Sequence, residues 1–389
     1  MQRPASLSEA AALFGPFDDR VWMNTAHQGP LPAPAVQAAQ DAALMKAAPH
    51  RLADEAFTVV PEELRRRWAE LVGADRDDVV LGDSTSHGMH VVANGLRWRS
   101  GDEVLTVAGD YPATVLPWRR LGEQGVSHRD LFPAGVVLTA EELTSAITDC
   151  TRVVALTWVD SFTGQSVDLE SLGEVCRRAG VLFVVNASQA LGARPLDVAN
   201  APVDAVVSCG YKWLCGPYGT GFTWLRPQLR EQLEPQQAYW LAMLAGRGLD
   251  QMRGLDLRHD LGVRAFDRFC PADFGDSLPM IAALDVILGA GVDAIAAHNQ
   301  GLIDRLLTSL DPERYELISP AEAQGRSTLV VLRSRTEDTQ RLRQRLTVAG
   351  VDTAYREASL RISLHLFNTE EQVDYVLELL GDRSSIGPT

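Results

Sequence analysis

The sequence predicts an α/β protein with two domains: a larger one on a doubly wound, mostly parallel sheet, and a smaller α/β domain at the carboxyl end. Three observations support this fold class. Apolar strand-like runs alternate with amphipathic helix-like runs about twenty residues apart, which is typical of parallel sheets with right-handed crossovers. The chain has 389 residues, 46% of them hydrophobic, so it can bury a large core. Polar residues directly follow several apolar runs, at one edge of the expected sheet.

The elements follow from periodicity and helix-start signals. Leu64, Trp68 and Leu71 recur at helical spacing on one face. Thr139 and Glu142 form a capping box at the start of a later helix. Helices are expected near residues 7–15, 35–47, 61–73, 85–96, from 113, 139–150, 168–180, 278–297, 336–350 and 369–381. Strands are expected near residues 77–82, 101–108, 152–164, 183–189, 203–212, 326–334 and 351–367.

Charge and cysteine usage exclude several classes of protein. The net charge of −15 and the pI near 5.0 argue against nucleic acid or an anionic membrane as a partner. No run approaches eighteen apolar residues, and the first residues lack a signal-peptide core. The five cysteines show no CxxC pairing, which indicates free thiols in a reducing cytoplasm. We therefore expect a cytoplasmic protein with a small-molecule substrate and no metal site.

Lysine usage singles out Lys212. Of 36 lysine and arginine residues only Lys46 and Lys212 are lysines, so the chain otherwise uses arginine for positive charge. Arginine stays protonated, whereas a lysine amine can lose its proton and attack a carbonyl. Lys212 follows an apolar strand and precedes the glycine-rich turn 216–221, while Lys46 has no such context. The alternative for Lys212 is an ordinary surface lysine at a strand end.

The neighbourhood of Lys212 suggests a carbonyl cofactor. Pyridoxal phosphate needs a lysine for its aldehyde, a partner for its ring nitrogen and a clamp for its phosphate. The strand at 183–189 ends in polar residues that include Asn186 and Gln189, and the next strand ends at Lys212. Because parallel strands present their carboxyl ends at one edge, both sets of residues can face one crevice.

These residues resemble the aminotransferase class V family of pyridoxal-phosphate enzymes, which includes cysteine desulfurases and isopenicillin-N-epimerase-like proteins. The family pattern is a strand ending D-x-x-[QH], a strand ending S-G-[HY]-K, and then G-P-x-G-x-G. Here these segments read Asn186-x-x-Gln189, Cys209-Gly210-Tyr211-Lys212 and GPYGTG at 216–221. The match is specific over about forty residues and departs from the pattern at Asn186 and Cys209. The resemblance implies the fold of the pyridoxal-phosphate-dependent transferases.

The resemblance also implies a set of cofactor contacts. Thr85 and Ser86 begin a helix where the family binds the phosphate, although an ordinary Ser/Thr helix cap explains them too. Tyr111 takes the place of the aromatic residue that stacks on the pyridine ring, the alternative being a core tyrosine. Ser161 follows a buried strand, where the family holds the cofactor's phenolic oxygen or the substrate. The expected cofactor-binding residues are Thr85, Ser86, Tyr111, Ser161, Asn186, Gln189, Ser208, Tyr211 and Lys212.

Two further residues are expected to bind the substrate. Arg361 lies in a segment similar to the family's R-x-S-x-x-x-Y-N-T strand, and its planar fork suits a carboxylate. The alternative is a structural ion pair. His27 lies in a segment that crosses the mouth of the site in the family, and a surface loop is the other interpretation. By the same resemblance, cysteine desulfurases carry a mobile cysteine just before the arginine, whereas this chain has no cysteine after Cys270.

The resemblance also orders the chain into three parts. Residues 1–30 are expected to pack near the small domain and the mouth of the site, residues 31–275 to form the cofactor-binding domain, and residues 276–389 to form the small domain. The irregular stretch after Pro227 is expected to shape the mouth of the site and a dimer contact, so a homodimer is predicted. One helix at 278–297 is expected to link the domains.

The predicted function is that of a pyridoxal-phosphate enzyme acting at the α-carbon of an amino acid. The preferred reaction is β-lysis of the C–S bond in a sulfur-substituted cysteine, within natural-product biosynthesis. Decarboxylative or oxidative deamination of such a conjugate, epimerisation and transamination are the alternatives. A binding protein that keeps the fold without chemistry is the non-enzymatic alternative. Lys212 is expected to hold the cofactor and to move the α-proton.

Overall fold

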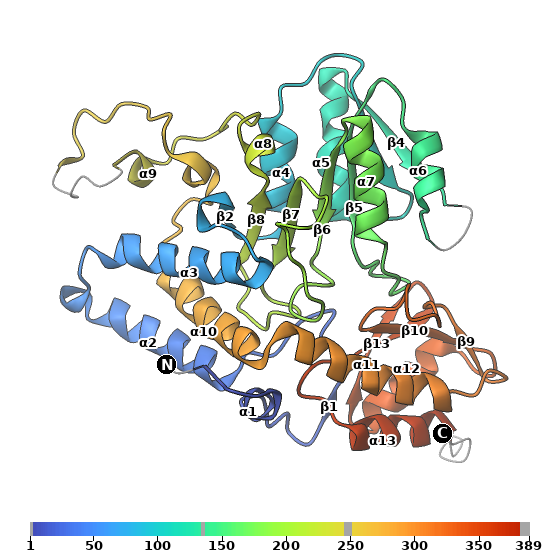
Figure 1. Ribbon diagram of the computed structural model, residues 1–389. Coiled ribbons are helices and arrows are strands. Elements are labelled where there is room, and N and C mark those ends of the chain that lie inside the picture. Colours follow the sequence, from blue (N-terminus) through green and yellow to red (C-terminus); the bar gives the residue numbers. More distant parts are fainter. Residues whose placement is uncertain (1–2, 134–136, 245–250, 382–389) are drawn as a thin grey trace.

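The large domain is built on a seven-stranded sheet. The computed structural model describes residues 3–133, 137–244 and 251–381, and within them the sheet order is β2-β8-β7-β6-β5-β3-β4 (Figure 1). Only β8 runs antiparallel to its neighbours, so the predicted mostly parallel sheet is confirmed. The strands are β2 (Val79–Gly82), β3 (Glu103–Val107), β4 (Ser127–Leu131), β5 (Thr151–Thr157), β6 (Leu182–Asn186), β7 (Ala205–Cys209) and β8 (Gly221–Leu225).

Helices cover both faces of this sheet. Side chains alternate along a strand, so Val184 of β6 joins the core under one layer while Val185 joins the core under the other. One layer contains α4 (Thr85–Gly95) and α5 (Pro112–Arg120). The other layer contains α2 (Ala33–Ala47), α3 (Ala56–Val72), α6 (Ala140–Ala146), α7 (Leu169–Ala179) and α10 (Phe274–Ala290). Burial on both faces explains why the central strands are apolar throughout.

The amino-terminal segment belongs structurally to both domains. After α1 (Leu7–Ala11), strand β1 (Val21–Trp22) pairs in parallel with β11 (Val351–Asp352) of the small domain. The small domain also contains an antiparallel sheet and three helices (Figure 1). These elements are β9 (Tyr315–Leu317), β10 (Leu329–Ser334), β12 (Ala354–Arg356), β13 (Ser359–Ser363), α11 (Val292–Ser309), α12 (Thr339–Val348) and α13 (Glu370–Gly381).

The expectation of one helix at 278–297 is wrong. Helix α10 ends at Ala290, α11 begins at Val292, and the axis bends by 73° at Gly291, whose φ is +79°. Glycine adopts this left-handed conformation at no steric cost, which explains the break. Because α10 packs against α2 and α3, the boundary placed at residue 276 falls inside a helix of the large domain. No single helix in the described ranges is long and apolar enough to cross a membrane; α10 and α11 pass that test only together.

The irregular stretch after β8 is anchored by a buried ion pair. It contains α8 (Pro227–Arg230), α9 (Trp240–Leu244) and a 3₁₀ turn at Gly262–Phe266, while residues 245–250 lie outside the described residues. Arg65 of α3 donates to both oxygens of Asp267, at 3.1 and 2.6 Å, and the backbone N–H of Leu81 donates to Asp267 as well. These bonds tie the stretch to the edge of the sheet.

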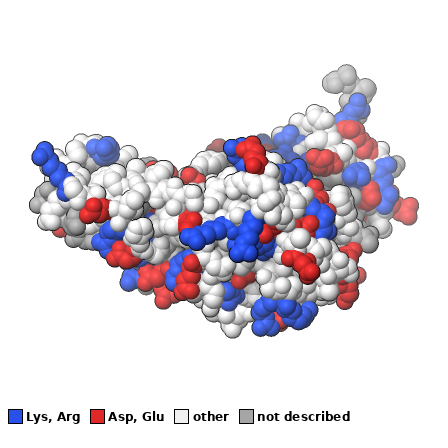
Figure 2. All heavy atoms as spheres, turned by 90° about the horizontal axis from the view of Figure 1, so that it is seen from above, with Lys and Arg blue, Asp and Glu red and all other residues white. Residues whose placement is uncertain are grey.

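Surface charges are intermixed rather than segregated. Figure 2 shows basic and acidic side chains side by side across the face seen from above. Arg264 pairs with Glu62 and Arg305 with Asp374, as examples of arginines held against carboxylates. All five cysteines are free thiols. A cytoplasmic location and a homodimer stay predictions.

Candidate active site

A small cavity lies at the carboxyl ends of β5, β6 and β7, beside the amino end of α4. Its volume is about 150 Å³. Eight of the eleven residues predicted from the sequence line it. These eight are Thr85, Ser86, Tyr111, Ser161, Asn186, Gln189, Tyr211 and Lys212. Most of the residues predicted to contact the cofactor therefore lie together, as expected for residues at the carboxyl ends of parallel strands.

Lys212 is buried three residues after β7 ends at Cys209. Burial lowers the pKa of its amine, and the nearby positive charge of Arg361 acts in the same direction. Its Nζ lies 5.3 Å from the ring centroid of Tyr111 and 6.0 Å from that of Tyr211. Tyr111 is 37% exposed, which excludes the core-tyrosine interpretation and places its ring at the cavity wall. The lowered pKa favours the neutral amine, which is the form that can act as a nucleophile or base.

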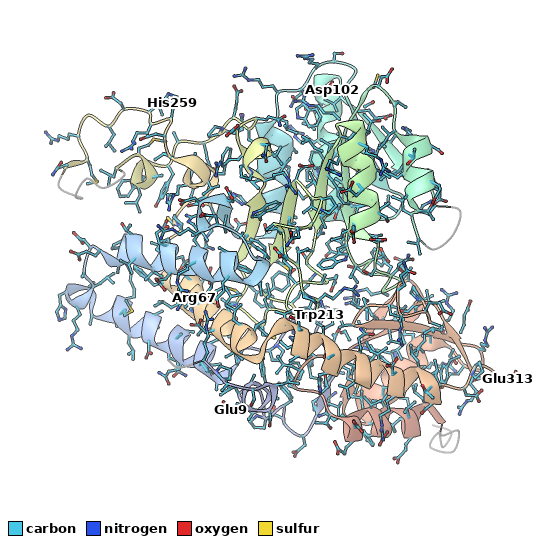
Figure 3. All side chains as sticks on the ribbon, in the orientation of Figure 1. Glu9, Arg67, Asp102, Trp213, His259 and Glu313 are labelled. Carbon is cyan, nitrogen blue, oxygen red and sulfur yellow. The ribbon has the colours of Figure 1, made fainter. Side chains whose placement is uncertain are left out.

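The amino-terminal loop packs directly on the peptide of Lys212. Gly29 donates its N–H to the carbonyl oxygen of Tyr211 at 2.9 Å. A Cβ on Gly29 would lie 2.0 Å from the carbonyl oxygen of Lys212, so only glycine allows this approach. The following residue, Trp213, is buried between the large and small domains (Figure 3). Its position next to Lys212 couples the lysine to the domain interface.

The amino end of α4 forms the polar floor of the cavity. Ser84 caps the helix by accepting a hydrogen bond from the N–H of His87, as an ordinary helix cap does. Thr85 and Ser86 line the cavity in the first turn, where N–H groups lack helical partners and the helix dipole is positive. The Thr85 hydroxyl lies 2.6 Å from that of Ser188. This arrangement suits a phosphate, and the residue that caps the helix is Ser84, not Thr85 or Ser86.

Asn186 is held by a hydrogen-bonded chain. Its Oδ1 accepts from the N–H of Ser188 at 3.0 Å, and its Nδ2 donates to Oγ1 of Thr114 at 2.9 Å. Thr114 lies 2.9 Å from Oγ1 of Thr157, which donates to the carboxylate of Asp110. Burial raises the pKa of Asp110 to about 6, against the hydrogen bonds that lower it. The amide orientation of Asn186 is therefore set by partners on two other elements.

Gln189 connects three segments around the site. Its Nε2 donates to the carbonyl oxygen of Ala26 at 3.1 Å and to Oγ of Ser161 at 3.2 Å. Its Oε1 accepts from the indole N–H of Trp213 at 2.9 Å. With these bonds Gln189 fixes the amino-terminal loop and the indole beside Lys212.

Three predicted residues lie outside this cavity. The Ser208 hydroxyl donates to the carbonyl oxygen of Cys209, and Cys209 lines the cavity in its place. His27 is exposed at the rim, and the pKa of its imidazole is lowered by burial of part of the ring and by Arg356, Arg361 and Lys212. Because β7 alternates its side chains between faces, only one of two neighbours, Ser208 or Cys209, can face the cavity.

Arg361 is a buried cation without a carboxylate partner. It is 4% exposed, and its Nη1 donates to the carbonyl oxygen of Ser161 at 3.0 Å. Its Nε is buried without a hydrogen-bond partner, and none of the described carboxylates forms an ion pair with it. Burial, together with the charge of Arg356, lowers the pKa of Arg361 to about 10. A buried unpaired charge is costly, and an anion bound at this position would offset that cost.

The residues present fit pyridoxal phosphate. One cavity combines a buried amine for the aldehyde, a helix amino end with hydroxyls for the phosphate, an aromatic face, and an amide for the ring nitrogen. Lys212, Thr85, Ser86, Tyr111 and Asn186 are the residues that would hold it. When bound, this cofactor supplies an electron-accepting ring for bonds at the α-carbon of an amino acid.

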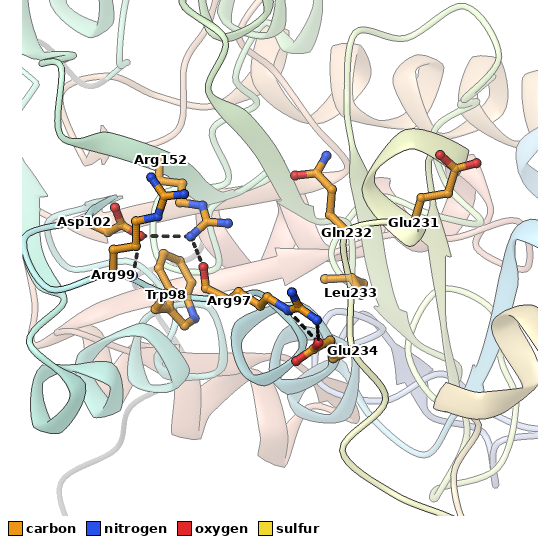
Figure 4. A pocket seen from close by; sticks show the side chains of 9 residues that line it. All are labelled: Arg97, Trp98, Arg99, Asp102, Arg152, Glu231, Gln232, Leu233 and Glu234. Atoms are coloured by element: carbon orange, nitrogen blue, oxygen red, sulfur yellow. Dashed lines mark hydrogen bonds and ion pairs between the residues drawn. The ribbon is translucent and has the colours of Figure 1, made fainter. Parts of the chain in front are cut away.

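A larger cavity elsewhere does not resemble a catalytic site. Its volume is about 840 Å³, and Asp102 and Arg152 in its wall (Figure 4) lie at the amino ends of β3 and β5. Arg152 pairs with Asp102 and Arg97 with Glu234, so charges of both signs in its wall neutralise one another. Arg99 and Glu231 also line it, and it contains no nucleophile of the kind found at Lys212.

The fold and the site define an enzyme dependent on pyridoxal phosphate. The sequence profile of the aminotransferase class-V family matches residues 24–239, more than half of the chain. This protein belongs to the aminotransferase class-V family, so the predicted family, fold class and cofactor are confirmed.

Curated relatives cover most of the chain. A probable cysteine desulfurase of Methanothermobacter thermautotrophicus is 25% identical over 401 aligned residues, covering 95% of this chain and 96% of that protein. The cysteine desulfurase IscS of Pectobacterium carotovorum is 26% identical over 339 residues, covering 83% and 80%.

Solved structures share the fold. The complex between the cystine C–S lyase C-DES and its reaction product cysteine persulfide superposes with a TM-score of 0.84 at 22% identity, covering 94% of this chain and 98% of that one. A cysteine desulfurase from Thermococcus onnurineus gives a TM-score of 0.83 at 20% identity, covering 98% of each chain.

Sequence reasoning missed the partners of Asn186. Thr114, Thr157 and Ser188 surround its amide, and Thr157 and Ser188 line the cavity. Thr157 is the last residue of β5, so the strand-end argument that selected Ser161 also covers it. Thr114 carries no such signal, because a threonine in the first turn of a helix is common.

Proposed function

We propose that this enzyme cleaves the C–S bond of a sulfur-substituted cysteine by β-elimination. The bond between Cβ and sulfur breaks, the sulfur leaves as a thiol or persulfide, and the remaining three-carbon fragment reacts with water to give pyruvate and ammonium. The main support is Arg361, a buried guanidinium with no carboxylate partner within the described ranges, reaching toward the cavity of Lys212. An amino-acid carboxylate is the anion that this position suits.

Lys212 has the properties of the base in such a reaction. Burial lowers the pKa of its amine, which favours the neutral form that can take the proton from the α-carbon. Because Arg361 holds the carboxylate, the α-proton of each bound substrate faces the amine of Lys212. Tyr111 and Tyr211 flank the amine and limit the access of water.

A tight hairpin supports lysis over sulfur transfer to the protein. Strands β12 and β13 are joined by Glu357 and Ala358 alone, directly before Arg361. No cysteine lies in this hairpin or after Cys270. An enzyme that passes sulfur to its own thiol needs a mobile nucleophilic cysteine here, as implied by the family resemblance. The leaving sulfur is therefore proposed to depart with the product.

Oxidative or decarboxylative deamination, with molecular oxygen as the electron acceptor, is the second candidate. Asn186 supplies an amide instead of a carboxylate for the ring nitrogen, and a neutral partner stabilises a protonated ring less. Elimination of a good leaving group is less affected than transamination or epimerisation. A role in natural-product biosynthesis stays a prediction.

Products of cysteine conjugates test the proposal. The holoenzyme is incubated with S-methylcysteine, cystine and cysteine, and pyruvate, thiol and alanine are measured by mass spectrometry. We expect pyruvate and the thiol or persulfide in equal amounts, and none above background with Lys212→Ala. Alanine from cysteine would instead indicate desulfurase chemistry, and a keto acid that keeps its sulfur would indicate deamination or transamination.

A further inference from the structure

A second polar cavity opens at the rim of the site. Its volume is about 280 Å³, and its wall comes from the amino-terminal loop, helix α12 and strand β12. The lining residues are Asn24, His27, Gln340, Arg343, Thr353, Ala354, Tyr355 and Arg356. None of the cofactor contacts described above needs this space.

Polar atoms in this wall lack partners within the protein. Oδ1 of Asn24, Oγ1 of Thr353 and Nε of Arg343 are buried and without a hydrogen bond among the described residues. Asn24 and Thr353 are 9% and 1% exposed. Buried polar groups in folded proteins are nearly always paired, so three residues with such atoms in one wall make this region an exception.

The cavity is also positively charged. Arg343 and Arg356 enter no ion pair with any carboxylate in the part of the chain that the structure describes, although most ion pairs of this acidic protein use arginine. Glu357, the nearest acid along the chain, is exposed and does not pair with Arg356. The positive charges of Arg356 and Arg361 both lower the pKa of His27. The excess of positive charge favours an anionic occupant.

Register places this cavity beside the carboxylate site. In the β12–β13 hairpin, Ala354 pairs with Arg361 and Arg356 pairs with Ser359. Arg356 and Arg361 are therefore diagonal neighbours on one face of the hairpin, a relationship that spans roughly 7–8 Å between Cα atoms. Two guanidinium groups at this separation can each bind one end of the same small molecule.

From this arrangement we infer that the substrate carries a second carboxylate, on its sulfur substituent, which binds in the cavity formed by Arg343, Arg356 and His27. The inference rests on the proposed C–S lysis and narrows its substrate class. Arg361 takes the α-carboxylate, Lys212 faces the α-carbon, and the acidic arm extends over the rim toward Arg356. Arg356 and Arg343 are then specificity-determining residues.

The turn next to Arg356 supports a functional role for the hairpin. Glu357 and Ala358 have φ values of +45° and +58°. A two-residue turn in which both residues adopt the left-handed backbone conformation strongly favours the sequence Asn-Gly. Glutamate and alanine are disfavoured there because residues with a Cβ rarely adopt a positive φ. Strained backbone of this kind clusters at ligand sites.

Two matched substrates test the inference by turnover. S-carboxymethylcysteine and its amide, S-carbamoylmethylcysteine, have nearly the same shape and differ in charge. We expect kcat/KM to be about tenfold higher for the acid than for the amide, mainly because its KM is lower. Only the acid can form a charge-assisted hydrogen bond with the two arginines in which both groups are charged. Arg356→Gln and Arg343→Gln should abolish the preference by lowering kcat/KM for the acid more than for the amide. The control is Arg341→Gln, an exposed arginine on α12, which should keep the preference.

A binding experiment separates this inference from the proposed reaction. 2-Aminoadipate and norleucine have the same chain length and no leaving group, so they bind without elimination. Calorimetry on the holoenzyme should give about tenfold tighter binding of 2-aminoadipate, lost in Arg356→Gln. Equal binding of the two would overturn the inference even if the conjugates are cleaved. A preference without any pyruvate would overturn the proposed lysis and leave the anion subsite intact.

Discussion

Asn186 donates a hydrogen bond from Nδ2 to Oγ1 of Thr114 across 2.9 Å, at the start of a chain of hydroxyl groups that ends at a carboxylate. Thr114 contacts Thr157, and Thr157 donates to Asp110. Each hydroxyl has one hydrogen to donate, so the chain runs in one direction from the amide to the carboxylate. An aspartate at position 186 would place an acceptor at both ends, and one contact would lack a hydrogen unless a carboxyl is protonated.

The first prediction concerns Asn186→Asp. The carboxylate would favour a protonated ring nitrogen in the bound cofactor, so we expect more transamination by-product relative to pyruvate. The product ratio is measured by mass spectrometry between pH 5 and 8. The substitution should also raise the pKa of Asp110 further above about 6, because a second carboxylate competes for the same hydroxyl hydrogens.

The double variant Asn186→Asp with Asp110→Asn is its matched control. Here the amide donates to Thr157 at the other end and the chain of hydroxyl groups runs in reverse, while the N–H of Tyr111 loses the oxygen that accepts its hydrogen bond. We expect this variant to regain part of the stability lost by the single Asn186→Asp change. An additive effect of the two substitutions on the free energy of unfolding would contradict the directional chain.

The second prediction concerns Arg361→Lys, which keeps a positive charge and loses the planar fork. Substrate affinity should fall by about 30–150-fold, corresponding to about 2–3 kcal/mol for a charge-assisted bidentate contact. Cofactor affinity should change much less, because Arg361 lies outside the cofactor cavity. Equilibrium binding of norleucine and of the cofactor measures the two effects separately. Unchanged affinity for norleucine would assign the carboxylate to another group.

The third prediction is that His365 causes part of the decrease in the free energy of unfolding at acidic pH. Its Nε2 lies 2.8 Å from the carbonyl oxygen of Trp213, and burial lowers its pKa to about 4. In the unfolded chain its pKa is about 6.5, so the unfolded state binds the proton first as pH falls. Above pH 6.5 the ionisation of His365 does not reduce the free energy of unfolding. As pH falls from 6.5 toward 4, it lowers that free energy by about 3 kcal/mol. Denaturant unfolding of the protein and of His365→Gln at several pH values measures this, and an equal slope in both would refute it.

The fourth prediction concerns the hairpin turn at Glu357 and Ala358. Ala358→Gly should raise the free energy of unfolding by about 0.5–1 kcal/mol, because glycine adopts a φ of +58° without the steric penalty of a side chain. Thermal unfolding gives the measurement. The control is Gly301→Ala on α11, where a Cβ would have open space, so that this change reports ordinary helix propensity. Gly381→Ala is less suitable because Gly381 is the last residue of α13. A lower stability of Ala358→Gly would show that the turn is unstrained.

The sequence alone determined the elements of the large domain and the residues at its strand ends. Strands such as β6 are apolar throughout because both faces are covered, and their ends are marked by polar residues such as Asn186 and Gln189. Lys212 was identifiable because it is one of only two lysines and precedes a glycine-rich turn. These signals are local, since periodicity and strand ends depend on neighbours along the chain.

Only the tertiary structure decided how distant segments meet. Whether Ser208 or Cys209 faces the cavity depends on the register of β7. The sequence of a short strand that is buried on both faces does not reveal this register. The break at Gly291 replaced an expected single helix, since the apolar pattern continues across it. The cavity of Arg343, Arg356 and the distant His27 exists because β1 pairs with β11 and brings the amino-terminal loop to the small domain. No local pattern specifies that contact, because it follows from packing between segments more than three hundred residues apart.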